Sequence, residues 1–290
     1  MPLHYELSDL RLLLILMRTR SLSASGEAAH LTTSAVSLRL RKLEDGIGAQ
    51  LFTRTGKGLV PTEAGTALAE AAVPILAEAA ALDARLNPFS KHDPEPLRIF
   101  SNSTGLQNFL CRIAADYLRE NSSFRAVLTE QRSSLTPEAV LTGEADLGLI
   151  GGIRELSPAY RTKLELVQFV EDRHVVILPR DSSAAQQFKN RPILFAELLN
   201  LRFAALTDAS PMTAAMKERA LAAGFRFEPI IEAPSFSLLV ELVARGPLAA
   251  VVPASAVPPN APVEVRELED SWAARPLAFV LPKARPALPS

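Results

Sequence analysis

The chain has 290 residues, 48% hydrophobic and 22% charged, a composition that fits soluble globular protein and excludes an intrinsically disordered chain. Its length predicts two or three compact units rather than one core, and its single cysteine, Cys111, excludes an internal disulfide and favours a reducing compartment. The net charge of −1 excludes a protein that coats nucleic acid indiscriminately.

The charge is unevenly distributed along the chain. The first 60 residues carry eight Lys or Arg against five Asp or Glu, whereas the remainder has a small acidic excess, as expected of a DNA-facing head on a larger body. We expect no signal peptide, because the apolar run Leu12–Met17 is short and lies among arginines. We also expect no run of the about 20 apolar residues that span a bilayer. The expectation is a cytoplasmic protein with no membrane partner.

The first 60 residues predict three helices followed by a hairpin. Helical spacing of apolar residues, a serine cap, a polar break and a tight glycine turn mark these elements. Gly48 is expected to end the third helix. The elements run over Leu7–Arg20, Ser23–His30 and about Thr33–Gly46, with a hairpin, or wing, from Leu51–Phe52 to Leu59–Val60.

A long alanine-rich helix is predicted next, beginning at the cap Thr62 and reaching about Asn87. Pro74 is expected to bend it locally. Apolar residues recur along it at alternating steps of four and three, which is the seam of a helix that pairs with another helix. The seam residues are Leu68, Ala72, Ile75, Ala79, Leu82 and Leu86. The proline-rich residues 89–96 then predict a hinge.

Beyond the hinge, strand and helix patterns alternate and predict a mostly parallel α/β architecture in two lobes with a cleft between them. The predicted strands are Leu97–Ser101, Arg125–Glu130, Ala145–Ile150, His174–Leu178, Arg202–Leu206, Phe227–Ala233, Leu248–Val252, Val263–Leu268 and Leu277–Leu281. The predicted helices are Leu106–Asn121, Thr136–Thr142, Met212–Ala223 and Ser235–Arg245.

The order of helix, short helix, polar turn and helix predicts a helix-turn-helix, whose second helix enters the major groove of DNA with its N-terminus nearest the bases. Short polar side chains stand at that end, and cations follow on the helix and the wing. Spacing alone fits equally well a capped helix with a solvated basic face. The candidate DNA contacts are Thr32, Thr33, Ser34, Ser37, Arg39, Arg41, Lys42, Arg54 and Lys57.

Several segments together resemble the head of the LysR-type transcriptional regulators. They are Ala29-His30-Leu31-Thr32-Thr33-Ser34-Ala35-Val36-Ser37, Leu43-Glu44, Gly48, Gln50-Leu51-Phe52, Arg54 and Thr62-Glu63-Ala64-Gly65. The resemblance is strong from Glu6 to Leu86 and weaker beyond. It implies a winged helix-turn-helix at 1–61, a dimerising linker helix at 62–88, the hinge at 89–96, and an effector domain like a periplasmic binding protein at 97–290.

The same resemblance implies how the chain works. Lobe I of the effector domain would comprise about 97–168 plus 265–290, and lobe II about 169–264. The implied partners are a double-stranded DNA operator, a small-molecule effector that in this family is often a carboxylate, and a second copy in a homodimer. A homotetramer, and RNA polymerase if the protein activates transcription, are further expectations from the family.

Two departures from the family pattern stand in the head. Leu38 occupies the position after Ser37 where the family often has arginine, and Arg39 comes one residue later, about 100° further round a helix. Ser25-Gly26 replaces the usual paired alanines of the second helix, where Gly26 should cost about 1 kcal/mol.

Polar and small residues follow several predicted strands, where open α/β sheets bind ligands. A helix beginning there could hold an anion on its free amides, and the family grips its effector at this position. For any single serine an ordinary helix cap is the commoner role. The candidate effector contacts are Asn102, Ser103, Thr104, Ser133, Ser134, Gly151, Thr207 and Phe236.

The sequence offers no enzyme chemistry. The four histidines are dispersed without metal-ligand spacing, and neither a phosphate-binding loop nor a nucleophile elbow is present, so no catalytic residue, metal or cofactor is expected. Cys111 is expected to pack in the core. A solute-binding protein and an α/β enzyme with a helical accessory remain alternatives, as does a regulator of this family that responds to no ligand.

Overall fold

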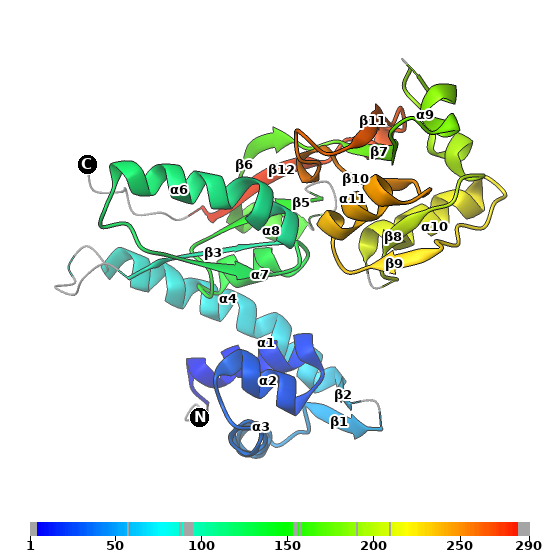
Figure 1. The fold of residues 1–290 in the computed structure, drawn as a ribbon. Helices are drawn as coiled ribbons and strands as arrows, with labels where there is room; N and C mark the ends of the chain where they lie inside the picture. The colour runs from blue at the N-terminus through cyan, green and yellow to red at the C-terminus, as the bar shows by residue number, and fades with distance from the viewer. Residues whose placement is uncertain are drawn as a thin grey trace.

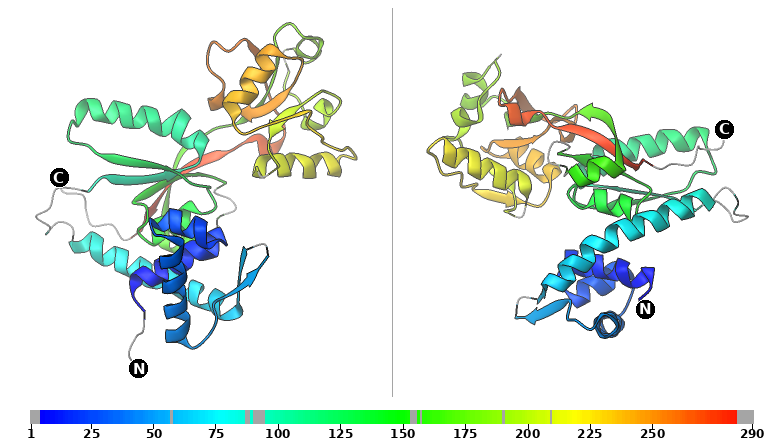
Figure 2. Two further views of the ribbon diagram at one scale, coloured as in Figure 1. Left: turned by 60° about the horizontal axis from the view of Figure 1, so that its bottom comes forward. Right: turned by 180° about the vertical axis from the view of Figure 1, so that it is seen from behind.

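The computed structural model describes residues 5–56, 58–86, 89, 95–152, 156, 158–189, 191–208 and 210–283. It consists of a small N-terminal head, a long helix and two α/β lobes (Figure 1). The long helix α4 lies between the head and the first lobe and contacts both (Figures 1 and 2). The predicted fold class is confirmed.

The head contains three helices and a two-stranded antiparallel wing in the predicted order. α2 begins one residue earlier than predicted, because Ser21 rather than Ser23 caps it by accepting a hydrogen bond from the Ala24 amide. Gly48 ends α3 in the left-handed region, as expected. Buried leucines of α1 and α3 form one core beneath the wing. The bounds are α1 Leu7–Thr19, α2 Leu22–Ala29, α3 Thr33–Ile47, β1 Phe52–Thr55 and β2 Gly58–Pro61.

The linker helix α4 spans Glu63–Leu86. The hydroxyl oxygen of Thr62 accepts a hydrogen bond from the Gly65 amide at 3.0 Å, so the predicted cap is confirmed. Ala69, Ala72 and Leu76 are buried against the head. The first half of α4 is therefore part of the head core. The predicted end of this helix at Asn87 and most of the predicted hinge lie outside the described residues.

The second half of the predicted seam is largely open to solvent in the described part of the chain: Ile75, Leu82 and Leu86 are all exposed. Among the described residues, α4 is long and apolar enough over Glu63–Asp83 to cross a membrane by length and composition alone. The expectation that no segment approaches that length is therefore wrong, and the reason is the alanine content of this helix. Its buried residues nonetheless pack on the head core rather than face lipid.

The first lobe is built on a five-stranded sheet in the order β4-β3-β5-β12-β6. β3 runs parallel to β4 and β5, as predicted, whereas β12 returns from the second lobe and is antiparallel to β5 and β6. β6 was not predicted. The strands are β3 Leu97–Ser101, β4 Ala126–Glu130, β5 Leu147–Gly151, β6 Leu164–Glu171 and β12 Pro276–Pro282. The helices are α5 Ser103–Gly105, the π-helical turn η2 Leu106–Leu110, α6 Cys111–Glu120, α7 Thr136–Leu141 and α8 Pro158–Lys163.

The second lobe contains the sheet β10-β7-β11 and the pair β8-β9. Both neighbours of β7 are antiparallel to it, so the prediction of a mostly parallel sheet is wrong here, and the predicted strand Phe227–Ala233 is only a short β9. The strands are β7 His174–Pro179, β8 Ala204–Leu206, β9 Ile231–Ala233, β10 Ala250–Pro253 and β11 Val263–Glu267. The helical elements are α9 Ser183–Gln187, η4 Phe195–Leu198, α10 Pro211–Ala222, α11 Phe236–Arg245, η5 Ala254–Ala256 and η6 Ser271–Ala273.

Two segments cross between the lobes. The chain enters the second lobe between β6 and β7 and returns between β11 and β12, which crosses back into the first sheet (Figure 2). The predicted lobe boundary at 265 falls inside β11, and this part of the prediction is wrong because β11 pairs with β7 in the second lobe.

Candidate functional site

The side of α3 that faces away from the head core carries polar and basic side chains. Thr32 caps this helix, because its hydroxyl oxygen accepts a hydrogen bond from the Ala35 amide at 3.2 Å, and it lies 3.0 Å from the hydroxyl of Ser34. The exposed residues of this side are Thr32, Thr33, Ser34, Leu38, Arg41, Lys42 and, in the last turn, the acidic Asp45. The structure thus gathers most of the predicted DNA contacts on one open surface, which we call the α3 face.

Arg39 does not belong to the α3 face. Its Nε donates to the Asp9 carboxylate at 3.0 Å, and a guanidinium nitrogen also bonds to the Ser8 hydroxyl, both on α1. The one-residue shift away from the position after Ser37 turns this side chain back toward the head, as the 100° step of a helix dictates. This geometry argues against the predicted DNA contact by Arg39, which instead ties α3 to α1.

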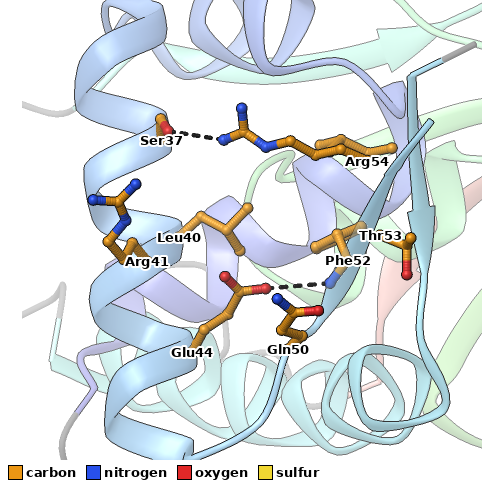
Figure 3. A pocket seen from close by; sticks show the side chains of 9 residues that line it. Ser37, Leu40, Arg41, Glu44, Gln50, Phe52, Thr53 and Arg54 are labelled. Atoms are coloured by element: carbon orange, nitrogen blue, oxygen red, sulfur yellow. Dashed lines mark hydrogen bonds between the residues drawn. The ribbon is translucent and has the colours of Figure 1, made fainter. Parts of the chain in front are cut away.

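A hollow of about 400 Å³ lies between α3 and the wing (Figure 3). Across it, Arg54 Nη2 on β1 donates to Ser37 Oγ at 3.2 Å. At its base, Glu44 Oε1 accepts hydrogen bonds from the amides of Leu51 at 2.8 Å and Phe52 at 3.3 Å. The Glu44 carboxylate therefore sets the position of the wing relative to α3. Lys57, the other predicted wing cation, lies outside the described residues.

Gly26 permits the tight approach of α2 to the start of α3. A Cβ atom placed on Gly26 would lie 2.6 Å from the backbone oxygen of Leu31, closer than side chains tolerate. Glycine is therefore required at this position by the packing of α2 against the turn that precedes α3. The glycine lowers the stability of the helix, but it allows the two helices to be joined by a tighter turn.

The head also contacts the first lobe directly. Arg18 on α1 donates two hydrogen bonds of 3.4 Å to the Glu144 carboxylate, just after α7. The neighbouring Gly143 lies against α4, where an added Cβ would be 2.7 Å from Ala80 Cβ. Burial raises the pKa of Glu138 on α7, and the nearby Arg18 partly offsets that rise. A movement of the first lobe would therefore displace residues that contact α1 and α4.

In the first lobe, three of the predicted effector contacts meet at the ends of three strands. Asn102 Nδ2, after β3, donates to Ser133 Oγ at 3.0 Å, and the Gly151 amide, at the end of β5, donates to the same oxygen at 3.3 Å. Asn102 Oδ1 also accepts from the Gly105 amide at 2.9 Å and so caps α5. The serine that follows β4 thereby links its two neighbours at this edge of the sheet.

The other predicted effector contacts are less close together. Ser103 Oγ donates to Glu130 at 2.6 Å, Thr104 is buried and Ser134 is exposed. In the second lobe, Thr207 is exposed after β8, and Phe236 opens α11 and packs on that lobe's core. No hydrogen bond joins these second-lobe residues to the Asn102 cluster in the described part of the chain.

The crossover between the lobes holds a buried polar network that sequence reasoning missed. The Asp172 carboxylate, 2% exposed, receives Nη2 of Arg275 at 2.8 Å and the hydroxyl of Ser255 at 2.9 Å. Asn108 Nδ2, from the π-helical turn of the first lobe, donates to Ser255 Oγ at 3.0 Å. One carboxylate thus joins both crossing segments, and the serine it holds bonds across to the first lobe. A sequence signal existed: a charged pair, Asp172-Arg173, interrupts two apolar strands.

His174 lies beside this network at the start of β7. Burial, and then the charges of Arg275 and Arg219, lower its pKa to about 4, so the imidazole is neutral at physiological pH. Its ring lies 5.9 Å from that of Trp272, over which Arg219 stacks at 4.9 Å. Buried ring or guanidinium nitrogens of Arg173, His174, Trp272 and Arg275 have no hydrogen-bond partner among the described residues.

Cys111 is exposed, so the expectation that it packs in the core is wrong. The π-helical turn before it adds a residue to the helical turn, because the Cys111 amide bonds to the Leu106 carbonyl, and Leu110 takes the buried position. No group of three or more His, Cys, Asp or Glu side chains suited to a metal ion occurs in the described part of the chain.

Two family models match the chain in succession. Residues 7–66 match the bacterial regulatory helix-turn-helix protein of the lysR family, and residues 90–290 match the LysR substrate binding domain. The second match alone covers more than half of the chain. The chain belongs to the LysR family. This order of domains favours a regulator over the solute-binding and enzyme alternatives.

Relatives of known sequence agree with the LysR assignment. The chain is 28% identical over 184 residues to YeiE of Escherichia coli K12, an uncharacterized HTH-type transcriptional regulator, across 63% of this chain and 60% of that protein. The match thus spans less than two thirds of that relative.

Solved structures show the same LysR fold along almost the whole chain. A full-length OxyR variant from Pseudomonas aeruginosa superimposes with a TM-score of 0.61 at 20% identity, covering 98% of this chain and 91% of that one. Full-length CbnR in complex with its target DNA gives 0.50 at 18% identity, with 96% and 94% covered.

Proposed function

We propose that this LysR-family chain is a sequence-specific DNA-binding transcriptional regulator, controlled by a small molecule bound in its C-terminal domain. The observation that carries the proposal is the α3 face, an exposed polar and basic surface on the second helix of a helix-turn-helix. The hydroxyl groups at the N-terminus of α3 are placed to hydrogen-bond with the edges of bases, and the basic side chains further along the helix can bind phosphate groups. The proposed division is a head at 1–61, a linker helix at 62–88, a hinge at 89–96 and an effector domain from 97.

The proposed DNA contacts are those predicted for the head except Arg39, whose side chain bonds to α1; Lys57 among them lies outside the described residues. Arg54 bridges to Ser37 at 3.2 Å, so the wing cation and the helix hydroxyl can approach the duplex together. The complex of CbnR with target DNA supports this mode of binding for a chain of the same fold. The set is Thr32, Thr33, Ser34, Ser37, Arg41, Lys42, Arg54 and Lys57.

Selection of duplexes from a random library with the full-length chain tests the proposal. We expect one recurring sequence with two related half-sites, bound at least about a thousandfold more tightly than scrambled DNA at physiological salt. Enrichment of no sequence, or equal binding of enriched and scrambled duplexes, would refute it.

We propose that the effector is a small carboxylate held where the strands of the first lobe end. Ser133 joins Asn102 and Gly151 there, and the amides that open the helical segment at Ser103 can receive an anion. Thr207 and Phe236 would close over it from the second lobe, with Thr104 and Ser134 completing the set.

A thermal-shift screen of small aliphatic and aromatic acids tests the effector site, because a ligand that binds the folded state raises the unfolding temperature. We expect a stabilising acid whose effect Thr104→Val removes while operator binding in its absence is kept. Leu221→Ala, on an exposed part of α10, serves as the control. If Thr104→Val keeps the full shift, the proposed site is wrong.

We further propose a cytoplasmic homodimer formed through α4, with no membrane partner, and a tetramer formed through the effector domains. Ile75, Leu82 and Leu86 are exposed along α4, and Ile113 and Tyr117 along α6, so both helices offer apolar surface to a second copy. RNA polymerase would be a partner if the protein activates transcription.

Leu82→Lys should weaken dimerisation and operator binding together in sedimentation and titration experiments; a variant that stays dimeric would contradict the role of α4.

A further inference from the structure

Leu38 is the one large apolar side chain on the α3 face. It is 55% exposed, whereas the neighbouring apolar residues Val36 and Leu40 are 0% and 5% exposed and belong to the head core. Two residues along a helix correspond to a turn of about 200°, so Leu38 lies almost opposite both of them. Leu38 therefore points away from the body of the head.

The neighbours of Leu38 on this outer side belong to the proposed DNA contacts. Ser34 comes four residues earlier and Arg41 three residues later, so all three share one side of the helix. Ser34 and Arg41 are both exposed. A helix that enters the major groove puts its outermost side closest to the floor of the groove, where the base edges lie.

An aliphatic side chain at that depth can recognise little. It offers no donor or acceptor to the polar atoms of guanine, cytosine or adenine, and it would leave such atoms without water or a partner. The major groove presents one apolar group, the 5-methyl group of thymine.

We infer that Leu38 is a specificity-determining residue that reads a thymine in each half-site by packing on its 5-methyl group. The inference rests on the proposed function, since it assumes that α3 enters the major groove. It also accounts for the head having leucine here in place of a cation: the position gives up a charged contact and gains discrimination between thymine and the other bases.

Thymine-to-uracil replacement tests the inference, because it removes only the methyl group. The enriched operator is resynthesised with deoxyuridine at each thymine in turn, and the full-length chain and its Leu38→Ala variant are titrated against every duplex. Transfer of one methyl group from water corresponds to about a fourfold change in affinity. For the unmodified chain, we expect uracil at one thymine position in each half-site to weaken binding by about that factor. For Leu38→Ala, the duplexes with thymine and with uracil at that position should bind equally well.

Leu221→Ala is the matched control, since it removes the same atoms from a 70% exposed leucine of the second lobe and should keep the uracil effect. If uracil weakens the unmodified chain and Leu38→Ala equally at every position, or weakens neither, Leu38 does not read a methyl group. In that case the operator itself still stands and only this inference fails. Failure to enrich any operator would instead refute the proposed function together with the inference.

Discussion

The α3 face and the crossover between the lobes both contain clusters of polar side chains, but those of the α3 face are exposed to water and those of the crossover are buried. On the α3 face, Ser34 and Arg41 stay exposed. At the crossover, Asp172 is buried and its charge is met by Arg275 at 2.8 Å. Exposed polar groups cost folding little and remain available to a partner, whereas a buried charge is tolerated only while it is paired. The polar residues of the α3 face should therefore govern DNA binding, and those of the crossover should govern folding.

Breaking the buried ion pair of Asp172 and Arg275 should destabilise the protein strongly. Asp172→Ala should lower the free energy of unfolding by about 3–5 kcal/mol, because it leaves Arg275 charged and buried without its partner. Denaturant titration of the full chain measures this loss. The double variant Asp172→Leu with Arg275→Met should recover most of it, since no buried charge then remains.

An exposed ion pair provides the control for that experiment. Glu197 pairs with Arg191 on the surface of the second lobe, and the pairing lowers the pKa of Glu197 to about 2. Water screens this pair, so Glu197→Gln should leave the unfolding midpoint nearly unchanged. If Asp172→Ala and Glu197→Gln lower the free energy of unfolding equally, the buried pair contributes no more to stability than the exposed pair, which would contradict this prediction.

A second prediction concerns the pH dependence of folding. His174 has a pKa of about 4 in the folded chain and about 6.5 when unfolded, so between these values the unfolded state binds the extra proton. Stability therefore falls as the pH drops from about 6.5 to about 4, by up to about 3 kcal/mol from this residue. Denaturant titrations at several pH values across that range should show that the free energy of unfolding depends less steeply on pH for His174→Phe than for the unmodified chain. Identical slopes for the two would contradict the neutral, buried imidazole.

The two regions also differ in how far the sequence reveals them. The head could be predicted because its signals lie within a few residues of each other: Thr32 caps α3, Gly48 ends it and Thr62 opens α4. The cluster of Asn102, Ser133 and Gly151 followed from the rule that parallel strands end at one edge of a sheet. Both depend on local pattern or on a general rule of topology.

What could not be predicted depends on contacts between distant parts of the chain. Asp172 and Arg275 are 103 residues apart, and the pairing of β6 with β12 joins segments equally remote. Arg39 turned out to bond to Asp9 because α1 packs across α3, which spacing within α3 does not reveal. Side-chain partners that lie far away in the sequence are thus what the sequence patterns do not reveal.

A smaller effect separates two arginines that the sequence treats alike. Arg39→Ala should lower the stability of the head by up to about 1 kcal/mol, by removing a partly exposed ion pair, and leave the salt dependence of DNA binding unchanged. Arg41→Ala should leave stability unchanged and reduce the slope of log affinity against log salt by about one unit. Titrations at several salt concentrations, with melting curves of the same samples, measure both quantities. A reduced slope for Arg39→Ala would place this residue on DNA after all.

If the α3 face reads bases as well as binding the DNA backbone, a competition titration of Ser34→Ala should separate the two roles. The variant and the unmodified chain compete for the enriched operator and for scrambled DNA at two salt concentrations. Loss of a base contact should cost about 1–3 kcal/mol on the operator and almost nothing on scrambled DNA. Arg41→Ala, run alongside, should weaken both duplexes alike. If Ser34→Ala loses affinity for operator and scrambled DNA equally, α3 does not read the operator as described.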